Sequence, residues 1–301
     1  MFTSHPGEFA ALLTAIFWTV TALAFTSAGK HIGSLAVNFW RLVIGLALLT
    51  AFIWIRDGFF YDNSITSHAI LWLAVSGFAG IFLGDLFLFK AFMITGPRIA
   101  LLIMSLSPPM AALFSWIFLG DIISLKGIAG MSLTLTGIIL VIFKKGNSGD
   151  NKSVLRYSAK GIFFAFLGAI GQASGIVMSK EGMPEGANAF AATQIRVIAG
   201  LAGFLLLITV IRRWGSVFKA AKNLKAMGTL SIGSFFGPFL GISFSLIAVS
   251  HTNPGIVQTI TAINPVLIIP FSVWLFKEKV TLREVLGSVI AVSGVALFFL
   301  G

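Results

Sequence analysis

Asp85 is the side chain of this 301-residue sequence whose surroundings most invite a chemical role. It is the one carboxylate well inside an apolar run, IFLGDLFLFK. A charge in such surroundings is costly unless it is paired or hydrated. We therefore expect Asp85 either to carry a proton or bind a cationic group, or to form a local ion pair with Lys90 or Arg98.

Two prolines interrupt apolar runs beside uncharged polar side chains. Pro108 and Pro265 lie well inside their runs, where proline removes a backbone hydrogen bond and bends a helix. The polar side chains near them are Ser105, Ser107, Gln258, Thr261 and Asn264. A broken helix with polar flanks at bilayer depth is typical of a substrate site, and both prolines are candidate hinges. The alternative is a kink that neighbouring helices tolerate.

Trp18 and Gln172 occupy corresponding depths in the first and sixth apolar runs. An aromatic ring on one wall and an amide on the other would suit an amphipathic organic molecule, so both are candidate substrate-binding residues. The alternative is a Trp that packs in the core or faces lipid. Gly84 and Gly241 each end a small-xxx-small pair, which favours close helix packing and makes them candidate hinges.

The composition requires that most of the chain avoids water. Hydrophobic residues make up 57% of it and charged residues 10%, against roughly 25% charged residues in a soluble domain. Runs of about 20 apolar residues can cross a bilayer. Ten are present, at 8–28, 34–55, 68–92, 97–119, 125–143, 160–180, 187–211, 227–249, 255–276 and 282–300. The predicted fold is an all-α polytopic membrane protein with ten transmembrane helices.

The two halves of the chain repeat each other at an offset of 157 residues. Gly84 recurs as Gly241 and Pro108 as Pro265 at this offset, along with other Gly, Ala and Pro positions. Five runs in each half make the second copy enter the membrane from the opposite side. The prediction is therefore two inverted five-helix repeats around a central cavity, at 1–146 and 160–301, joined by a basic linker at 147–159.

The distribution of basic residues predicts the orientation. The chain has 21 Lys and Arg against 10 Asp and Glu. The basic residues lie mostly in short links between the apolar runs, which indicates membrane topology rather than nucleic-acid binding. On the face opposite the linker only Arg56, Lys126 and Lys180 are basic. We expect a multi-pass protein of the plasma (inner) membrane with a cytoplasmic linker. Arg41 and Arg196, inside the second and seventh runs, are expected to be structural or snorkelling charges near opposite faces.

Other kinds of chemistry find no support in the sequence. Cysteine is absent, and the four His show no metal-ligand spacing. Phosphate-binding glycine motifs and a nucleophile with a base are missing as well. We expect no metal, no cofactor, no enzymatic activity and no ATP-driven pumping by this chain alone.

The sequence resembles the drug/metabolite transporter superfamily, in its branch with two EamA-type repeats. The resemblance covers nearly the whole chain and rests on the five-plus-five layout, the segments NFWRLVIG and TQIRVIAG around Arg41 and Arg196, and the ending FKEKVTLREVLGSVIAVSGVALFF. It implies a cavity lined mainly by the first, third and fourth helices of each repeat. It also implies helix-end roles for Asp121 and Glu278, although Gly120 and Asp121 depart from the usual ending of the first repeat.

The predicted function is secondary transport of small organic metabolites by alternating access. By resemblance, the direction is efflux and the cargo amino acids or related compounds; a carrier of drugs or other metabolites is the alternative. A channel or a non-transporting scaffold is less favoured, because a scaffold gains nothing from buried Gln, Asn and Asp. The expected partners are a small-molecule substrate and the lipid bilayer. Transport could be coupled to protons, with Asp85 as the candidate proton carrier. The expected oligomeric state is a monomer or a weak homodimer.

Overall fold

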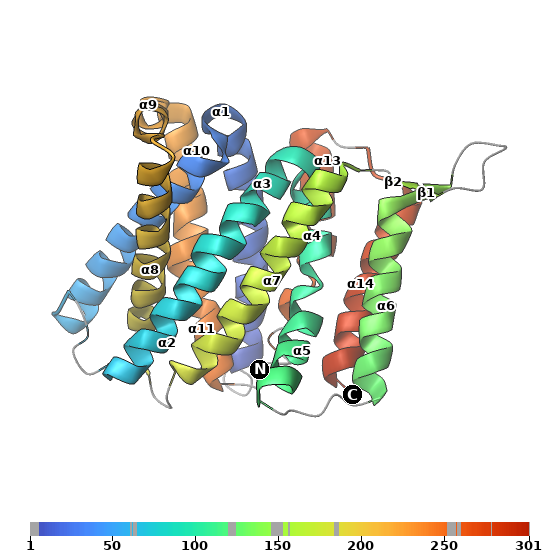
Figure 1. The fold of residues 1–301 in the computed structure, drawn as a ribbon, viewed down its shortest axis with the longest axis horizontal. Helices are drawn as coiled ribbons and strands as arrows, with labels where there is room; N and C mark the ends of the chain where they lie inside the picture. The colour runs from blue at the N-terminus through green and yellow to red at the C-terminus, as the bar shows by residue number, and fades with distance from the viewer. Residues whose placement is uncertain are drawn as a thin grey trace.

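The computed structural model describes residues 6–300, apart from residues 61, 63–64, 120–124, 146–152, 156, 184–186, 252–256, 258–259 and 278. Helices run side by side between two faces of the molecule (Figure 1). Both chain ends lie at one face, here called the termini face. A two-stranded sheet lies at the other, here called the linker face.

Each half of the chain supplies a series of helices in the same order. The first half contains α1 (Pro6–Asp57), α2 (Ser67–Gly77), the π-helix η1 (Phe78–Gly84), α3 (Asp85–Thr95), α4 (Pro97–Met104), α5 (Ser107–Leu119) and α6 (Leu125–Ile142). The second half contains α7 (Ala159–Glu181), α8 (Ala189–Val210), α9 (Trp214–Ala221), α10 (Leu224–Ser234), the π-helix η2 (Phe235–Gly241), α11 (Ile242–His251), α13 (Asn264–Phe276) and α14 (Leu282–Leu300).

The predicted ten crossings agree with this path. In α1, Gly33 separates the first two spans with φ 78° and ψ 155°, a conformation that glycine adopts without strain. The chain rises through the first part of α1 and returns through the second (Figure 1). Among the described residues, seven helices are long and apolar enough to cross a membrane. One of these seven, α1, crosses twice, and α13 and α14 add two more crossings, which gives the ten that were predicted. The fold is therefore the predicted polytopic helical one.

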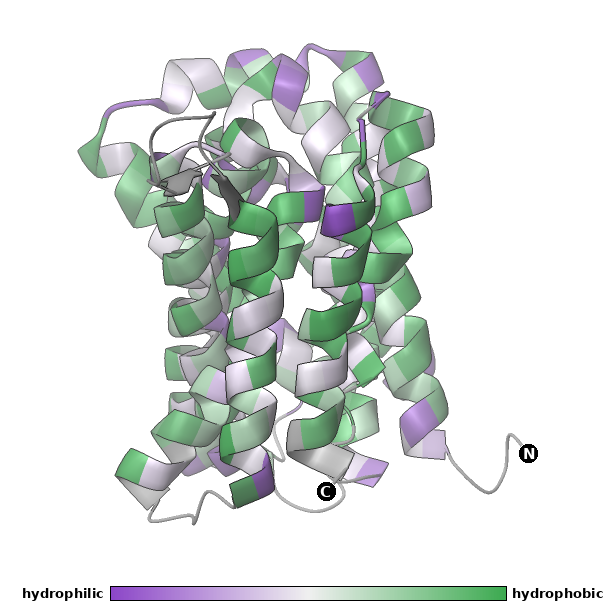
Figure 2. Cartoon of the chain, turned by 90° about the vertical axis from the view of Figure 1, so that its right-hand side faces the viewer, coloured by the Kyte–Doolittle hydropathy of each residue, from purple (hydrophilic) through white to green (hydrophobic). Residues whose placement is uncertain are grey.

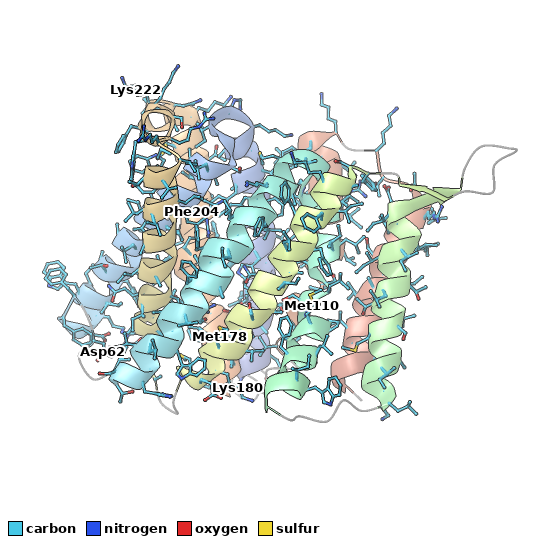
Figure 3. All side chains as sticks on the ribbon, in the orientation of Figure 1. Asp62, Met110, Met178, Lys180, Phe204 and Lys222 are labelled. Atoms are coloured by element: carbon cyan, nitrogen blue, oxygen red, sulfur yellow. The ribbon has the colours of Figure 1, made fainter. Side chains whose placement is uncertain are left out.

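The surface matches a protein surrounded by lipid. Hydrophobic residues dominate the middle of the helices, and hydrophilic residues gather towards the two faces (Figure 2). Leu206, Val210 and Trp274 are 65%, 70% and 79% exposed, a degree of apolar exposure that water would penalise. Lys222 lies at the linker face, and Asp62 and Lys180 lie at the termini face (Figure 3).

The pseudo-two-fold relation between the halves is visible where α6 packs along α14. The Thr134 hydroxyl donates to the carbonyl of Ala291 at 3.3 Å, and these residues stand 157 positions apart. Gly137 touches the same partner helix, and a Cβ added there would lie 2.5 Å from the carbonyl oxygen of Gly287. The two helices, the last of each half, therefore meet backbone to backbone at one side of the molecule (Figure 1).

We expect Gly137→Val to lower the apparent melting temperature of the detergent-solubilised protein by several degrees. The added side chain has no space between α6 and α14, and overpacking of this kind costs about 1–3 kcal/mol. Gly228→Val is the matched control, because it makes the same change within α10 at an exposed position with open space around it. Equal melting temperatures for the two variants would contradict this account of the α6–α14 contact.

Two local elements at the linker face differ from the sequence-based expectation. The loop after the seventh span contains the eight-residue helix α9, which is too short to register as a span; Trp40 donates its indole N–H to the carbonyl of Val217 in it at 2.9 Å. No strand was predicted in this region, but β1 (Phe143–Lys145), at the end of the first repeat, pairs with the antiparallel β2 (Ser153–Leu155) in the linker.

Candidate functional site

A central cavity lies between the two repeats. Its volume is about 190 Å³, and side chains of both halves line it. Lining residues come from the first, third and fourth helices of each repeat, as the family resemblance implies. In addition, Arg41 and Arg196 reach the cavity from the second helix of each repeat. The expectation that these two arginines lie near opposite faces is therefore wrong.

Most of the predicted site residues meet at this cavity. Those that line it are Trp18, Asp85, Ser105, Ser107, Pro108, Gln172, Thr261, Asn264 and Pro265. Gln258, Asp121 and Glu278 lie outside the described residues. Residues from widely separated parts of the sequence thus share one small volume, although their roles in binding stay a prediction.

Asp85 is held in a buried network with Arg41. Its Oδ2 lies 2.6 Å from Nη2 of Arg41, and its Oδ1 accepts a hydrogen bond of 2.9 Å from Nε2 of Gln172. Arg41 is itself fixed by Asn38, whose Oδ1 accepts from Nε at 3.1 Å. The guanidinium carbon of Arg41 also lies 4.7 Å from the centre of the Phe89 ring. Both carboxylate oxygens of Asp85 are therefore occupied by partners within the chain.

The ion-pair partners expected for Asp85 were wrong. Lys90 lies over aromatic rings nearer the linker face, with Nζ 5.4 Å from the centre of Phe164. Arg98 instead approaches Glu284, as described below. Neighbours in sequence are poor guides here, because Arg41 lies on a different helix and reaches Asp85 only through helix packing.

Arg196 is the second arginine of the cavity and has a different environment. It is 5% exposed, and its buried Nε has no hydrogen-bond partner in the part of the chain that the structure describes. Its guanidinium lies against η1, where a Cβ added to Gly80 would be 3.7 Å from Nη2. No ion pair within 4.0 Å joins Arg196 to Asp85, both of which are described residues. The side chain thus presents a charge to the cavity without a bonded counter-charge.

The glycines predicted as hinges lie where the π-helices pack against the first helix of the opposite repeat. A Cβ added to Gly84 would lie 3.2 Å from the backbone nitrogen of Gln172, and one added to Gly241 would lie 2.8 Å from Nε1 of Trp18. Trp18 and Gln172 therefore occupy equivalent places in the two halves. The alternative of a purely lipid-facing Trp18 is wrong, because the residue lines the cavity.

The helices around Pro108 and Pro265 are interrupted rather than simply bent. Pro108 is the second residue of α5, and Pro265 is the second residue of α13, each directly after a turn. A proline in the first helical turn removes a donor that would have no partner anyway. The expectation that these prolines remove a bond from a continuous helix is thus wrong, although the predicted breaks in both spans are present.

Hydroxyl and amide groups gather at these interruptions. The buried hydroxyls of Ser105 and Ser107 have no hydrogen-bond partner in the structure. Asn264 accepts a bond of 3.4 Å from Thr19, and the Thr261 hydroxyl donates to the carbonyl of Val257 at 2.9 Å. The hydroxyls of Ser105 and Ser107 are available to a ligand that enters the cavity.

A second charged cluster, missed in the sequence, joins α4 to α14 at the linker face. Arg98 Nη1 lies 3.4 Å from Oε2 of Glu284, and both side chains are buried. Tyr157 donates its hydroxyl to Oε1 of the same carboxylate. The backbone N–H of Thr281 also donates to Glu284, at 2.7 Å. The Thr-x-x-Glu spacing of this helix start is a capping box, and this signal could have identified Glu284.

Helices that cross a membrane in two inverted halves around a central cavity define the class of inverted-repeat membrane transporters. The model of the EamA-like transporter family matches residues 5–143 and 159–300. The chain therefore belongs to this family, which is part of the drug/metabolite transporter superfamily. It is a multi-pass membrane protein that transports small molecules, a transporter rather than an enzyme.

Two further similarities agree with this assignment. An uncharacterized transporter of Archaeoglobus fulgidus is 24% identical over 296 residues, covering 96% of this chain and 96% of that protein. A solved crystal structure has the same fold, with a TM-score of 0.64 and 18% identity over 98% of this chain and 96% of that one. Neither similarity indicates the cargo.

Proposed function

We propose that the protein is a secondary transporter that exports small organic metabolites, such as amino acids or related compounds, by alternating access. The observation that carries the proposal is the cavity between the inverted repeats, lined at Pro108 and Pro265 by interrupted helices from both halves. Inverted repeats that rock about a central site are the usual basis of alternating access. Efflux and the amino-acid cargo rest on family analogy alone.

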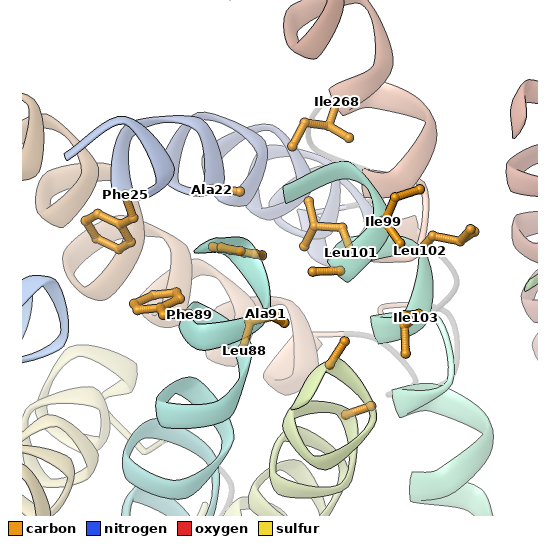
Figure 4. Close-up of a cluster of buried hydrophobic side chains, with 14 of the residues drawn as sticks. Ala22, Phe25, Leu88, Phe89, Ala91, Ile99, Leu101, Leu102, Ile103 and Ile268 are labelled. Atoms are coloured by element: carbon orange, nitrogen blue, oxygen red, sulfur yellow. The ribbon is translucent and has the colours of Figure 1, made fainter. Parts of the chain in front are cut away.

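Packing at the linker end of the cavity supports the idea of a gate. Ile99, Leu102 and Ile103 of α4 are each 1% exposed and pack in one cluster with Ile268 of α13 (Figure 4). In our proposal, α4 must part from α13 before a substrate can pass between the cavity and the linker face. The Arg98–Glu284 ion pair ties the same end of α4 to α14, the helix that follows α13 in the chain. In our proposal, α13 and α14 move together, so this ion pair also opposes the opening.

We place the protein in the plasma (inner) membrane with the linker face in the cytoplasm. The support is the excess of Lys and Arg in the short links on that face. Because the chain has no cysteine, single Cys variants at Lys222 and Asp62 test the orientation directly. A membrane-impermeant maleimide should label the Asp62→Cys variant in intact cells and the Lys222→Cys variant only after permeabilisation; the reverse pattern would overturn the orientation.

Counterflow in proteoliposomes tests the transport mode. Vesicles loaded with an unlabelled amino-acid mixture should take up labelled amino acids transiently, with a rate that saturates as the external concentration rises. Flux that rises without saturation would indicate a channel. Absence of flux with every pool of amino acids and related metabolites would indicate a non-transporting scaffold.

Asp85 is our proposed coupling residue. Its pair with Arg41 lines the cavity, so protonation of the carboxylate would remove an ion pair at the substrate site itself. Direct docking of a cationic substrate on Asp85 has less support, because Arg41 and Gln172 already occupy both carboxylate oxygens. The variant that separates these roles is treated in the Discussion.

A further inference from the structure

The charged side chains that line the cavity do not balance. Arg41, Asp85 and Arg196 are the charged residues of its described lining. Arg41 and Asp85 neutralise each other at 2.6 Å. Arg196 is left as an excess positive charge, 95% buried, in a site walled mainly by apolar side chains.

A buried cation without a bonded counter-charge is costly, because desolvation is not repaid by attraction. Arg196 has the further cost of a buried Nε–H that donates to no acceptor in the structure. A ligand that brings an acceptor with a negative charge would offset both costs. A guanidinium presents its donors as a planar fork that matches the two oxygens of a carboxylate.

The rest of the cavity indicates what the anionic group is attached to. Trp18, Phe25, Phe89 and Leu101 provide an apolar and aromatic wall, which suits an uncharged hydrocarbon body. The unpartnered hydroxyls of Ser105 and its neighbour Ser107 could accept or donate one further hydrogen bond.

We propose that Arg196 docks the carboxylate of the transported substrate, so that the cavity selects small organic carboxylates with an apolar body. This inference rests on the proposed transport function and narrows its substrate class. It assigns recognition to the arginine that makes no ion pair within 4.0 Å among the described residues, and it leaves the Arg41–Asp85 pair intact when substrate binds.

The test measures direct binding of ligands to the purified protein in detergent. The readout is the rise in melting temperature that each ligand causes at millimolar concentration. Four compounds share one hydrocarbon body: leucine carries a carboxylate and an ammonium, 4-methylpentanoate only the carboxylate, 3-methylbutylamine only the ammonium, and 4-methylpentanamide neither charge. We expect the two carboxylates to bind about tenfold or more tightly than the amine and the amide.

Variants then assign the effect to one side chain. Arg196→Gln should weaken carboxylate binding by about tenfold or more, and Arg196→Lys should weaken it less, since the charge remains but the fork is lost. Arg213→Gln, at an exposed position on the linker face, is the control and should bind as the parent does. If Arg196→Gln does not fold, Arg196→Lys still assigns the effect to this side chain, and the carboxylate–amide comparison on the parent protein still tests the substrate class.

Tighter binding of the amine, equal binding of the amide, or binding of none of the four compounds would overturn the inference. The result is separable from the transport proposal, because binding in detergent requires no flux. Arg196-dependent carboxylate binding without counterflow would refute transport alone. Saturable counterflow of amines but not of carboxylates would refute the substrate class alone.

Discussion

Asp85→Asn is expected to destabilise the protein and to abolish proton-driven accumulation of substrate. Asn keeps the shape of the side chain but removes the charge. Arg41, 3% exposed, would then remain in the membrane without its carboxylate at 2.6 Å. Loss of one partner of a buried ion pair costs about 3–5 kcal/mol. Thermal unfolding in detergent measures the first effect, and uptake under an imposed pH gradient measures the second.

Two controls isolate the buried pair. The double variant Arg41→Gln with Asp85→Asn should recover most of the lost stability, because no unpaired charge remains. Asp57→Asn breaks another Arg–Asp pair, Arg56 with Asp57 at 2.5 Å, in which the arginine side chain is 40% exposed. Asn at this position can still accept the hydrogen bond that Asn188 donates to Asp57, so the substitution should change stability little.

The transport readout then separates the proposed roles of Asp85. Exchange retained without accumulation would assign coupling to Asp85. Selective loss of binding for ammonium-bearing compounds would assign docking instead. A variant that unfolds, exchanges and accumulates like the parent would show that coupling, if any, depends on another residue.

Glu284→Gln is expected to open the linker end of the cavity more often. Gln can still accept the N–H of Thr281 in the capping box, and its NH2 group can donate to the Tyr157 hydroxyl in place of the bond that Glu284 accepts from it. The substitution therefore removes mainly the ion pair with Arg98 at 3.4 Å. A loss of ~1.4 kcal/mol from the closed state would raise the population open to the linker face about tenfold. The result would be a transporter whose cavity is reached more readily from that face.

The natural absence of cysteine makes this effect measurable. Leu101 lines the cavity from α4 and is 9% exposed. In a Leu101→Cys background, a membrane-impermeant maleimide applied at the linker face should react about tenfold faster when Glu284→Gln is added. Arg283→Gln, one residue away and exposed, is the control. An unchanged labelling rate would show that the ion pair does not hold the gate.

The overall architecture was predictable because it depends on run lengths and on the internal repeat. The spans follow from apolar length alone, and inversion follows from five of them in each half. Some site residues could also be predicted as candidates, because polar groups inside apolar runs are rare and costly. These are Asp85, Gln172 and the serines before Pro108. These are properties that a sequence carries locally.

The pairing within the site was not predictable in the same way. Arg41 meets Asp85 across 44 positions, and Gln172 meets it across 87; only the crossing of helices decides such partners. Lys90 and Arg98 are closer to Asp85 in sequence, but the prediction that either pairs with it was wrong. The depth of Arg196 was misjudged for the same reason, because run position does not reveal which way a buried side chain is turned.

The π-helices give the two halves different mechanical properties. The N–H of Asp85 bonds to the carbonyl of Gly80, five residues back, and Ile242 bonds to Gly237 in the same way. Conversion of either segment to regular α-helix would change its register by one residue and rotate the helix that follows by about 100°. In the first half that rotation would swing a carboxylate away from Arg41. In the second half the equivalent position is Ile242, so the same rotation of α11 would break no ion pair there.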